Sequence, residues 1–388
     1  MIIPYGKHKI DSKDIKYVEK SLKSKFIAQG PLVSKFEINL KHKVKSKYCV
    51  AVNSATSALH ISCLALGINH KDLVWTVPNT FVSTANAALF CGASIDFVDI
   101  DEKNFNICLN SLKKKLEISK KEKKLPNLLI VVHLAGNPTL AKEIKKLSKI
   151  YKFKILEDAS HSLGAKYYGK NVGCSLWSDA TVFSFHPVKM ITTAEGGAVM
   201  TNNKKIYKNL CLFSNNGITK NKKDFLIKNK QPNYYEQQVL GFNYRMNELQ
   251  AALGISQLTK LDKFIKERNL IANYYKKKLI HKKIGFQELS KNFLSSYHLF
   301  VIKILGKNND KLRNRILFWL KKKKIYVGIH YYPVHLHPYY KKLGFYRGNF
   351  PKSEKYSDTV MSLPIYCGLK KKDLDFIIKN ILITLNAK

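Results

Sequence analysis

Arginine is scarce in this chain of 388 residues. Of its 68 lysine and arginine residues, only five are arginine, which leaves 63 lysines; the arginines are Arg245, Arg268, Arg313, Arg315 and Arg347. Guanidinium groups read guanine edges and hold phosphates through two hydrogen bonds, so their scarcity disfavours sequence-specific nucleic-acid binding. The formal net charge of +41 comes from lysines scattered between apolar positions, which is typical of a solvated surface. We therefore expect no nucleic-acid partner.

Three further signatures are missing. The seven cysteines form no CxxC pair and no cysteine–histidine cluster with zinc spacing, so we expect reduced thiols and no metal site. The N-terminus has no apolar run like that of a signal peptide, and no apolar run elsewhere reaches the roughly 18 residues of a membrane span. These absences predict a cytoplasmic protein without a membrane partner.

Two phosphate-binding motifs are also absent. In "GAKYYGKNVG", Asn171 stands where a nucleotide triphosphatase loop needs serine or threonine, and the stretch instead predicts a hairpin around Gly169 and Lys170. No GxGxxG motif follows the first predicted strand, which disfavours the usual dinucleotide-binding fold.

From about residue 48, short β-rich runs alternate with helical patterns. Strands are predicted at residues 48–52, 72–77, 128–136, 153–158, 180–185 and 196–201, and helices at 56–66, 81–90 and 139–152. Such alternation implies crossover connections and a largely parallel sheet covered on both faces. The sequence therefore predicts an α/β fold.

The rest of the chain predicts a second, smaller domain. The lysine-rich stretch 218–232 has the composition of an exposed loop. Residues 245–279 carry apolar side chains at three- and four-residue spacing, which predicts one long helix. A strand at 297–305, a helix at about 310–323 and a C-terminal helix follow. We expect a large domain over 1–250 and, over 251–388, a long connecting helix with a small α+β domain.

Two stretches suit a ligand site. Thr56 and Ser57 in "NSATSALH" lie at a predicted helix start, where free N–H groups attract phosphate, although both residue types are also ordinary helix caps. Asp158 ends a buried strand, where open α/β sheets place ligands. It could face a protonated ring nitrogen, or it could cap a helix or form a core salt bridge. His161 could orient that group or be a satisfied core histidine.

Lys189 differs from the other lysines because it follows an apolar strand and precedes a Thr-Thr-x-Glu-Gly-Gly turn. We expect its amine to project into a site. A free lysine has a pKa of about 10.4, but desolvation leaves the amine neutral and reactive. Ser184 could donate a hydrogen bond to a phosphate. A reactive lysine, a helix start that attracts phosphate and a carboxylate at a strand end are the parts that a pyridoxal phosphate site needs.

The motif "SFHPVKMITTAEGG" and the stretches from "FIAQGPLVSKFE" to "SLPIYCGL" resemble the DegT-type sugar aminotransferases. This resemblance implies the fold type I of aspartate aminotransferase, with pyridoxal 5'-phosphate as cofactor. Lys189 would hold the cofactor and move the proton. Asp158 would face the pyridine nitrogen, and Phe81 would stack on the ring. The resemblance assigns the phosphate to Thr56, Ser57 and Ser184. Ala194 stands where many relatives carry glycine.

The resemblance also implies partners. Asn243 would reach the phosphate of the neighbouring subunit's cofactor, which means a homodimer with shared active sites. L-glutamate would donate the amino group to a nucleotide-linked keto sugar. Phrases such as "VHLAGN" and "HYYPVHLHPYYKKLGF" are most similar to the subgroup of pseudaminic acid biosynthesis, which acts on a UDP-linked sugar. Gln29, Arg245 and His330 are the candidate substrate contacts, and His330 could equally be a core or loop histidine.

Three alternatives stay open from the sequence. The acceptor could be another nucleotide-linked 4-keto sugar, such as a perosamine or 4-amino-arabinose precursor. A deoxygenating enzyme would carry histidine at the position of Lys189, so the lysine disfavours that chemistry. A basic protein that kept the fold but bound nucleic acid would not need both Lys189 and Asp158.

Overall fold

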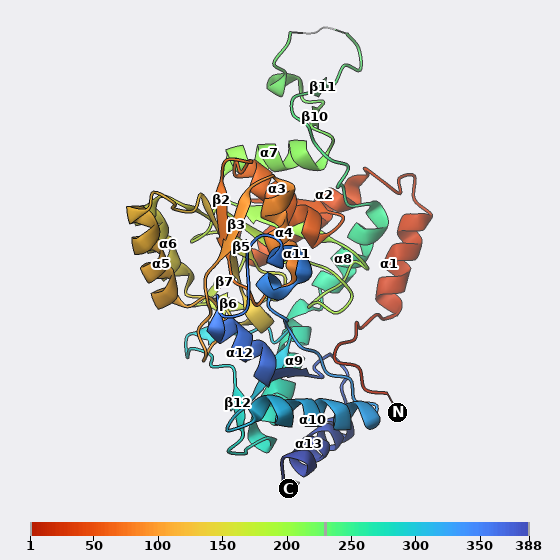
Figure 1. Cartoon of the computed structure of the whole chain (residues 1–388). Helices are drawn as coiled ribbons and strands as arrows, with labels where there is room; N and C mark the ends of the chain where they lie inside the picture. The colour runs from red at the N-terminus through yellow and green to blue at the C-terminus, as the bar shows by residue number, and fades with distance from the viewer. Residues whose placement is uncertain (1, 229–230, 387–388) are drawn as a thin grey trace.

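A seven-stranded sheet lies at the centre of the computed structural model, which describes residues 2–228 and 231–386 (Figure 1). The strand order is β1-β9-β8-β5-β4-β2-β3. The strands are β1 (Tyr48–Val52), β2 (Leu73–Thr76), β3 (Ser94–Phe97), β4 (Leu128–Val132), β5 (Lys154–Asp158), β8 (Ala180–Ser184) and β9 (Gly197–Thr201). Five strands from β3 to β8 pair in parallel, whereas β9 is antiparallel to both of its neighbours.

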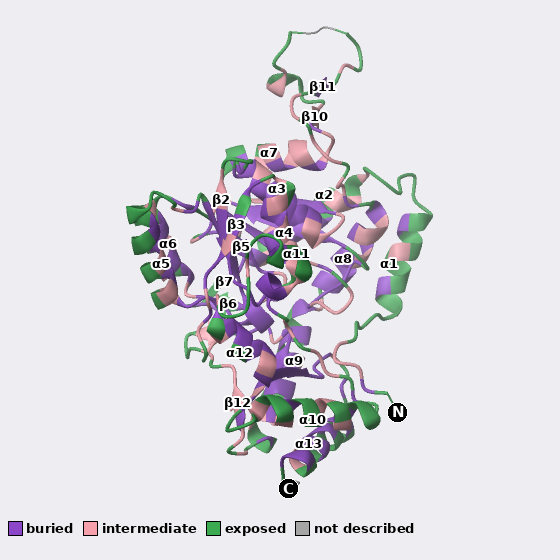
Figure 2. Cartoon of the chain, viewed as in Figure 1, coloured by how far each residue is buried: buried purple, intermediate pink, exposed green. Residues whose placement is uncertain are grey.

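Helices cover both faces of this sheet, and Figure 2 shows its buried strands between them. On one face α3 (Ala55–Ala65), α4 (Val82–Phe90) and α7 (Lys204–Ser214) pack in one apolar cluster. On the other face lie α2 (Pro31–Val44), α5 (Leu109–Lys121) and α6 (Ala141–Tyr151). Every residue of β4 and β9 is buried, as expected for strands covered on both sides. The predicted α/β sheet is confirmed.

A smaller antiparallel sheet packs its own core near the C-terminus. It consists of β12 (Ile284–Phe286), β14 (Phe300–Ile304) and β15 (Val360–Leu363). The core is shared with α9 (Leu261–Lys278), α10 (Asn309–Lys322) and α13 (Lys371–Asn386), and Ile3 from the N-terminus joins it. The predicted domain boundary between residues 250 and 251 falls inside α8 (Glu248–Leu258), and the two-domain division stays a prediction.

The single long helix predicted at 245–279 is wrong, because the chain breaks between α8 and α9. At the break the Thr259 hydroxyl donates to the Ser256 carbonyl, and the Lys260 N–H donates to the Gln257 carbonyl, three residues back. The Lys260 ammonium lies 2.6 Å from an Asp14 oxygen and 2.8 Å from an Asp11 oxygen. These contacts fix a turn that the apolar spacing of the sequence does not reveal.

The segment between α7 and α8 projects from the body of the molecule (Figure 1). Here β10 (Ile218–Thr219) pairs with β11 (Glu236–Gln237). The predicted loop 218–232 is exposed or half-buried over its described residues, and 229–230 lie outside them. The hairpin predicted around Gly169 is confirmed, since β6 (Lys166–Tyr167) and β7 (Lys170–Asn171) pair antiparallel.

The remaining elements are short or peripheral. They are α1 (Ser12–Leu22), η1 (Leu134–Gly136), η2 (Lys222–Asp224), β13 (Phe293–Leu294), η3 (Val334–Leu336), α11 (Pro338–Lys341) and α12 (Pro351–Thr359). Over residues 2–228 and 231–386, no helix combines the length and the apolar character that crossing a membrane requires.

Candidate active site

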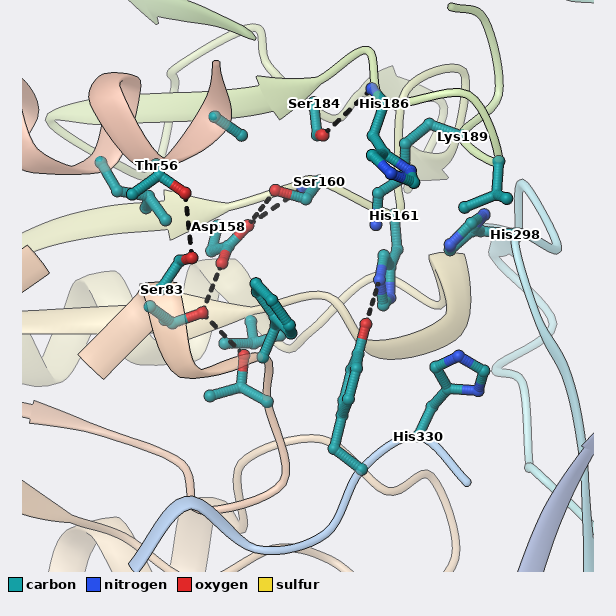
Figure 3. Close-up of a pocket in the computed structure, with 18 of the residues that line it drawn as sticks. Thr56, Ser83, Asp158, Ser160, His161, Ser184, His186, Lys189, His298 and His330 are labelled. Atoms are coloured by element: carbon teal, nitrogen blue, oxygen red, sulfur yellow. Dashed lines mark hydrogen bonds between the residues drawn. The ribbon is translucent and has the colours of Figure 1, made fainter. Parts of the chain in front are cut away.

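A cavity of about 500 Å³ opens at the ends of β5 and β8. The carboxyl ends of parallel strands meet at one edge of the sheet, so residues far apart in sequence converge there. Figure 3 shows the close-up. Seven of the residues predicted from the sequence line this cavity: Thr56, Phe81, Asp158, His161, Ser184, Lys189 and His330.

Asp158 is buried at the end of β5, with only 6% of its surface exposed. Its Oδ2 accepts a hydrogen bond of 2.7 Å from the Thr84 hydroxyl, and its Oδ1 accepts 2.6 Å and 3.1 Å bonds from the Ser160 hydroxyl and N–H. Within the described part of the chain Asp158 forms no salt bridge. A buried carboxylate that is oriented only by neutral donors is suited to meet a cation in the cavity.

Lys189 follows β8 and points its amine into the same cavity. Burial lowers the pKa of Lys189 to about 8, and the Asp158 charge opposes that shift. Its backbone N–H donates to the His186 carbonyl at 2.9 Å, which helps to hold the loop. At pH 7 about a tenth of this amine is therefore unprotonated and able to attack a carbonyl carbon, far more than for a lysine with the ordinary pKa of about 10.4.

The Thr-Thr-x-Glu-Gly-Gly turn brings β9 against the start of α3. A Cβ on Gly197 would lie 2.6 Å from the Ser54 carbonyl oxygen, so only glycine allows this close approach. Ala194 has φ +65°, in the left-handed region that favours glycine. Alanine there costs about 1 kcal/mol in backbone strain. This strain gives a physical reason why many relatives carry glycine at this position.

The N-terminus of α3 forms the second wall of the cavity. Ser54 caps the helix by accepting a hydrogen bond from the Ser57 N–H, and the Thr56 hydroxyl lies 2.9 Å from the Ser83 hydroxyl. Ser54, Thr56 and, on the facing strand, Ser184 line the cavity, whereas Ser57 is buried and does not. Free N–H groups and the dipole of an eleven-residue helix make this end suited to a phosphate.

Three histidines, His161, His298 and His330, surround Lys189 at one end of the cavity, which we call the inner end. The His161 and His298 rings lie 4.3 Å apart, and His330 Nδ1 lies 2.9 Å from the Ser362 hydroxyl. Burial, reinforced by the charge of Lys189, lowers the pKa of His330 to about 4 and holds the pKa values of His161 and His298 well below the ordinary range. All three imidazoles are therefore neutral at physiological pH.

Besides Ser57, three further predicted residues do not line the cavity. Gln29 is exposed and has φ +54°. Asn243 is exposed and pairs with Asn215 in an isolated bridge. Arg245 donates a 2.7 Å hydrogen bond to the Asn215 side chain. Their predicted roles in substrate and cofactor binding stay predictions.

Sequence reasoning also missed several residues of the cavity, namely Tyr5, Ser83, Thr84, Ser160, His298 and Tyr331. Five of these belong to stretches that resemble the family: Ser83 and Thr84 to "NTFVSTAN", Ser160 to "EDASH", His298 to "SSYHLF" and Tyr331 to "HYYPVH". The phrases were therefore a usable signal. What they could not supply is the contact that each side chain makes across the cavity.

These residues fit the predicted cofactor. Lys189 offers an amine to an aldehyde, Asp158 an unpaired carboxylate to a ring nitrogen, and the start of α3 a cradle for a phosphate. Phe81 precedes α4 and is 57% exposed beside the cavity, so its ring is free to stack on a planar ligand. Charge, shape and chemistry agree on one ligand, pyridoxal 5'-phosphate.

Comparisons with known proteins agree with this site. The sequence profile described as "DegT/DnrJ/EryC1/StrS aminotransferase family" matches residues 8–382. A UDP-4-amino-4,6-dideoxy-N-acetyl-beta-L-altrosamine transaminase of Campylobacter jejuni is 35% identical over 97% of this chain and 96% of its own. A GDP-perosamine synthase of Escherichia coli O157:H7 is 31% identical over 98% of this chain and 97% of its own.

Solved structures are similar over the same length. Helicobacter pylori PseC, an aminotransferase involved in the biosynthesis of pseudoaminic acid, superposes with a TM-score of 0.89 at 30% identity and covers 99% of both chains. The pyridoxal phosphate form of the sugar aminotransferase Spr1654 of Streptococcus pneumoniae has a TM-score of 0.88 at 26% identity and covers 99% of this chain and 98% of its own.

Proposed function

The chain belongs to the DegT/DnrJ/EryC1/StrS aminotransferase family, and from this premise we propose that it aminates C4 of a UDP-linked 4-keto-6-deoxy-N-acetyl L-sugar with L-glutamate. The product would be UDP-4-amino-4,6-dideoxy-N-acetyl-β-L-altrosamine, for pseudaminic acid biosynthesis. That the chain is a pyridoxal phosphate-dependent sugar aminotransferase of fold type I follows from its family. The proposal for this sugar rests on one observation, the full-length similarity to the Campylobacter jejuni transaminase.

Each wall of the cavity has a role in this reaction. When bound, pyridoxal phosphate supplies an aldehyde that accepts an amino group and a ring that delocalises the electrons of a broken C–H bond. Asp158, oriented by Thr84 and Ser160, would hold a proton on the ring nitrogen. Thr56 and Ser184 would hold the phosphate, and Phe81 would pack on the ring.

Lys189 is the group that we expect to move protons. Its Nζ would take the proton from the carbon that bears the amino group of glutamate and would pass it to a carbon of the cofactor. A pKa of about 8 places this amine close to physiological pH, where it can both accept and release a proton. The same residue would act in both halves of the reaction, first on glutamate and then on C4 of the sugar.

A homodimer with shared sites is the second part of the proposal. The segment that leads to Asn243 and Arg245 projects from the body, and it carries apolar side chains in water. Leu226, Ile227 and Leu240 are 79%, 63% and 80% exposed. A second copy of the chain would cover them and would receive Asn243 at its cofactor phosphate. Gln29, Arg245 and His330 would then contact the nucleotide sugar.

One other acceptor has support. The chain is also similar over nearly its full length to a GDP-perosamine synthase, so a GDP-linked 4-keto sugar is the second candidate. Both candidates use the same half-reaction with glutamate, and they differ only in the nucleotide and the sugar. The cytoplasmic location expected from the sequence stays a prediction.

A substrate panel tests the proposal. The purified enzyme is incubated with cofactor, L-glutamate and UDP-, GDP- and dTDP-linked 4-keto sugars, and 2-oxoglutarate and the aminated sugar are measured by mass. We expect selective conversion of the UDP-linked N-acetylated L-sugar. Preferred conversion of the GDP-linked sugar would overturn the pathway and keep the enzyme class, and the Lys189→Ala variant gives the background of both measurements.

A further inference from the structure

Arg268 is a buried cation at the junction of α9 with the strands β14 and β15. Only 2% of its surface is exposed, and among the described residues it forms no salt bridge. Its Nη1 instead donates to the backbone carbonyl oxygens of Tyr297, His298 and Ile365, at 3.2, 3.2 and 2.9 Å. Burial of a guanidinium without a carboxylate is costly, so these carbonyls must offset that cost. The same bonds fix the backbone at all three places.

The first two carbonyls stand on either side of His298, a residue that lines the active-site cavity. Tyr297 has φ +46°, in the left-handed region that residues with a side chain rarely adopt. Strained backbone of this kind persists only where neighbouring groups hold it. Arg268 supplies such a hold, because it bonds the backbone immediately before and after His298.

The third carbonyl links Arg268 to the N-terminal segment of the chain. Ile365 follows β15, and its backbone N–H donates to the Tyr5 carbonyl at 3.1 Å. Tyr5 also lines the cavity, and its ring lies 5.2 Å from the His330 ring. One guanidinium therefore anchors two cavity residues that are distant in the sequence.

Tyr5, His298 and His330 all attach to the small antiparallel sheet, and we call them the small-sheet wall of the cavity. His298 precedes β14, and His330 Nδ1 lies 2.9 Å from the hydroxyl of Ser362 in β15. Figure 3 shows His298 and His330 on the opposite side of the cavity from Thr56. Because the groups that fit the cofactor lie on the central sheet and at the start of α3, we expect the small-sheet wall to face the substrates.

We propose that Arg268 is a positioning residue that holds Tyr5 and His298 where the amino donor and the amino acceptor meet them. Arg268 does not line the cavity itself, so it acts through the residues that it holds. Arg268 and Lys189 both line a narrower cavity of about 10 Å³, which places this hold close behind the reactive amine. Burial is the main cause of the low pKa of His298, and the Arg268 charge contributes to it. The inference rests on the proposed amino transfer and not on the identity of the sugar.

The loss of Arg268 should impair the reaction with substrates and spare the cofactor. A misplacement of about 1 Å can slow a reaction about 100-fold, whereas the groups that fit the cofactor lie on other elements. Stopped-flow absorbance of the holoenzyme with L-glutamate measures the first half-reaction, and titration of cofactor-free protein measures cofactor affinity. For Arg268→Met we expect the second-order rate constant of the half-reaction to fall about tenfold or more, with cofactor affinity near that of the wild type.

Arg313→Met is the matched control, because Arg313 is also a buried arginine, 7% exposed, but lies on α10 and does not line the cavity. It should keep the wild-type half-reaction. Arg268→Lys retains the charge and three N–H donors for the three carbonyls, so it should recover part of the rate. A wild-type rate constant in Arg268→Met, or an equal loss in Arg313→Met, would overturn the proposal. Should Arg268→Met fail to fold, the comparison of Arg268→Lys with Arg313→Lys decides in the same way.

Crystal structures give a readout that does not depend on the amino donor. In the Arg268→Met holoenzyme, Tyr5 and His298 should move by about 1 Å relative to the wild type, while Asp158 and Lys189 stay in place. An unmoved small-sheet wall would contradict the inference, whichever substrates the enzyme uses. A displaced wall in an enzyme whose wild type does not react with glutamate would support the inference and contradict the proposed function.

Discussion

The inner end of the cavity and the projecting segment differ in how much a single chain achieves. At the inner end Asp158, Lys189 and Ser160 come from one edge of one sheet, and the Ser160 hydroxyl donates to Asp158 within one copy of the chain. In the projecting segment Asn243 is exposed, outside the cavity and next to uncovered apolar residues. In the proposed dimer, one chain would build the chemistry and a second copy would close the site.

The largest effect should come from the inner end. Lys189→Ala removes the only amine that lines the cavity among residues 2–228 and 231–386, and we expect turnover to fall more than about 1000-fold. The measurement is 2-oxoglutarate release, with circular dichroism to show that the variant folds. Lys149→Ala, at an exposed position of α6, is the control and should retain wild-type turnover. Amination that persists in Lys189→Ala would remove the basis of the mechanism.

Asp158→Asn should have the next largest effect. The amide keeps the size of the side chain but loses the charge that, in the proposed mechanism, would hold a proton on the ring nitrogen, and we expect turnover to fall about 100-fold or more. The rates of both half-reactions should fall together in stopped-flow absorbance. A loss restricted to the sugar half-reaction would show that Asp158 acts on the substrate instead.

The depressed pKa of Lys189 sets a pH dependence at the inner end. Below about pH 8 the amine is protonated and cannot attack the cofactor aldehyde, so capture of pyridoxal phosphate by cofactor-free protein should rise about tenfold per pH unit and level off above about pH 8. Stopped-flow absorbance measures the rate. An increase that continues up to the ordinary lysine pKa of about 10.4 would show that burial does not perturb the pKa of Lys189.

Asn243→Ala addresses the outer region and should act more weakly. If Asn243 reaches the partner's cofactor phosphate, its loss removes one hydrogen bond to a charged group, and cofactor affinity should fall about tenfold. Equilibrium titration of cofactor-free dimer measures this, and sedimentation shows whether the dimer persists. An unchanged affinity in an intact dimer would argue that each chain completes its own site.

Gln29→Ala should produce the smallest change. Gln29 is exposed in the single chain and would contact only the sugar nucleotide. We expect KM for the sugar to rise about threefold, with kcat and the half-reaction with glutamate unaltered. A change in kcat, or in the reaction with glutamate, would mean that Gln29 supports the cofactor and not the acceptor.

The sequence predicted the inner end well because its residues lie in local motifs at strand ends. Asp158 closes a buried apolar run and Lys189 follows another, so the order of strands alone brings them to one edge. The break at Thr259 escaped prediction because it depends on Lys260 meeting Asp14, which is distant in the sequence. Tyr331 escaped for the same reason, since its contact with His161 joins residues 170 positions apart.

The region outside the cavity could not be derived from one chain at all. Side chains such as Leu240 are exposed on a single copy of the chain, and the proposed dimer would cover them. The same holds for Asn243, whose proposed target is a phosphate in another copy. The local sequence pattern therefore predicts the residues that line the cavity better than it predicts the contacts that a second copy would supply.

The most direct test of the account is to trap the cofactor on the chain. Holoenzyme is reduced with borohydride and digested. Mass spectrometry then searches for a phosphopyridoxyl group on each of the 63 lysines of the chain. The account predicts modification at Lys189 with near-unit occupancy and at no other lysine. Modification spread over surface lysines, or absent from Lys189, would contradict it.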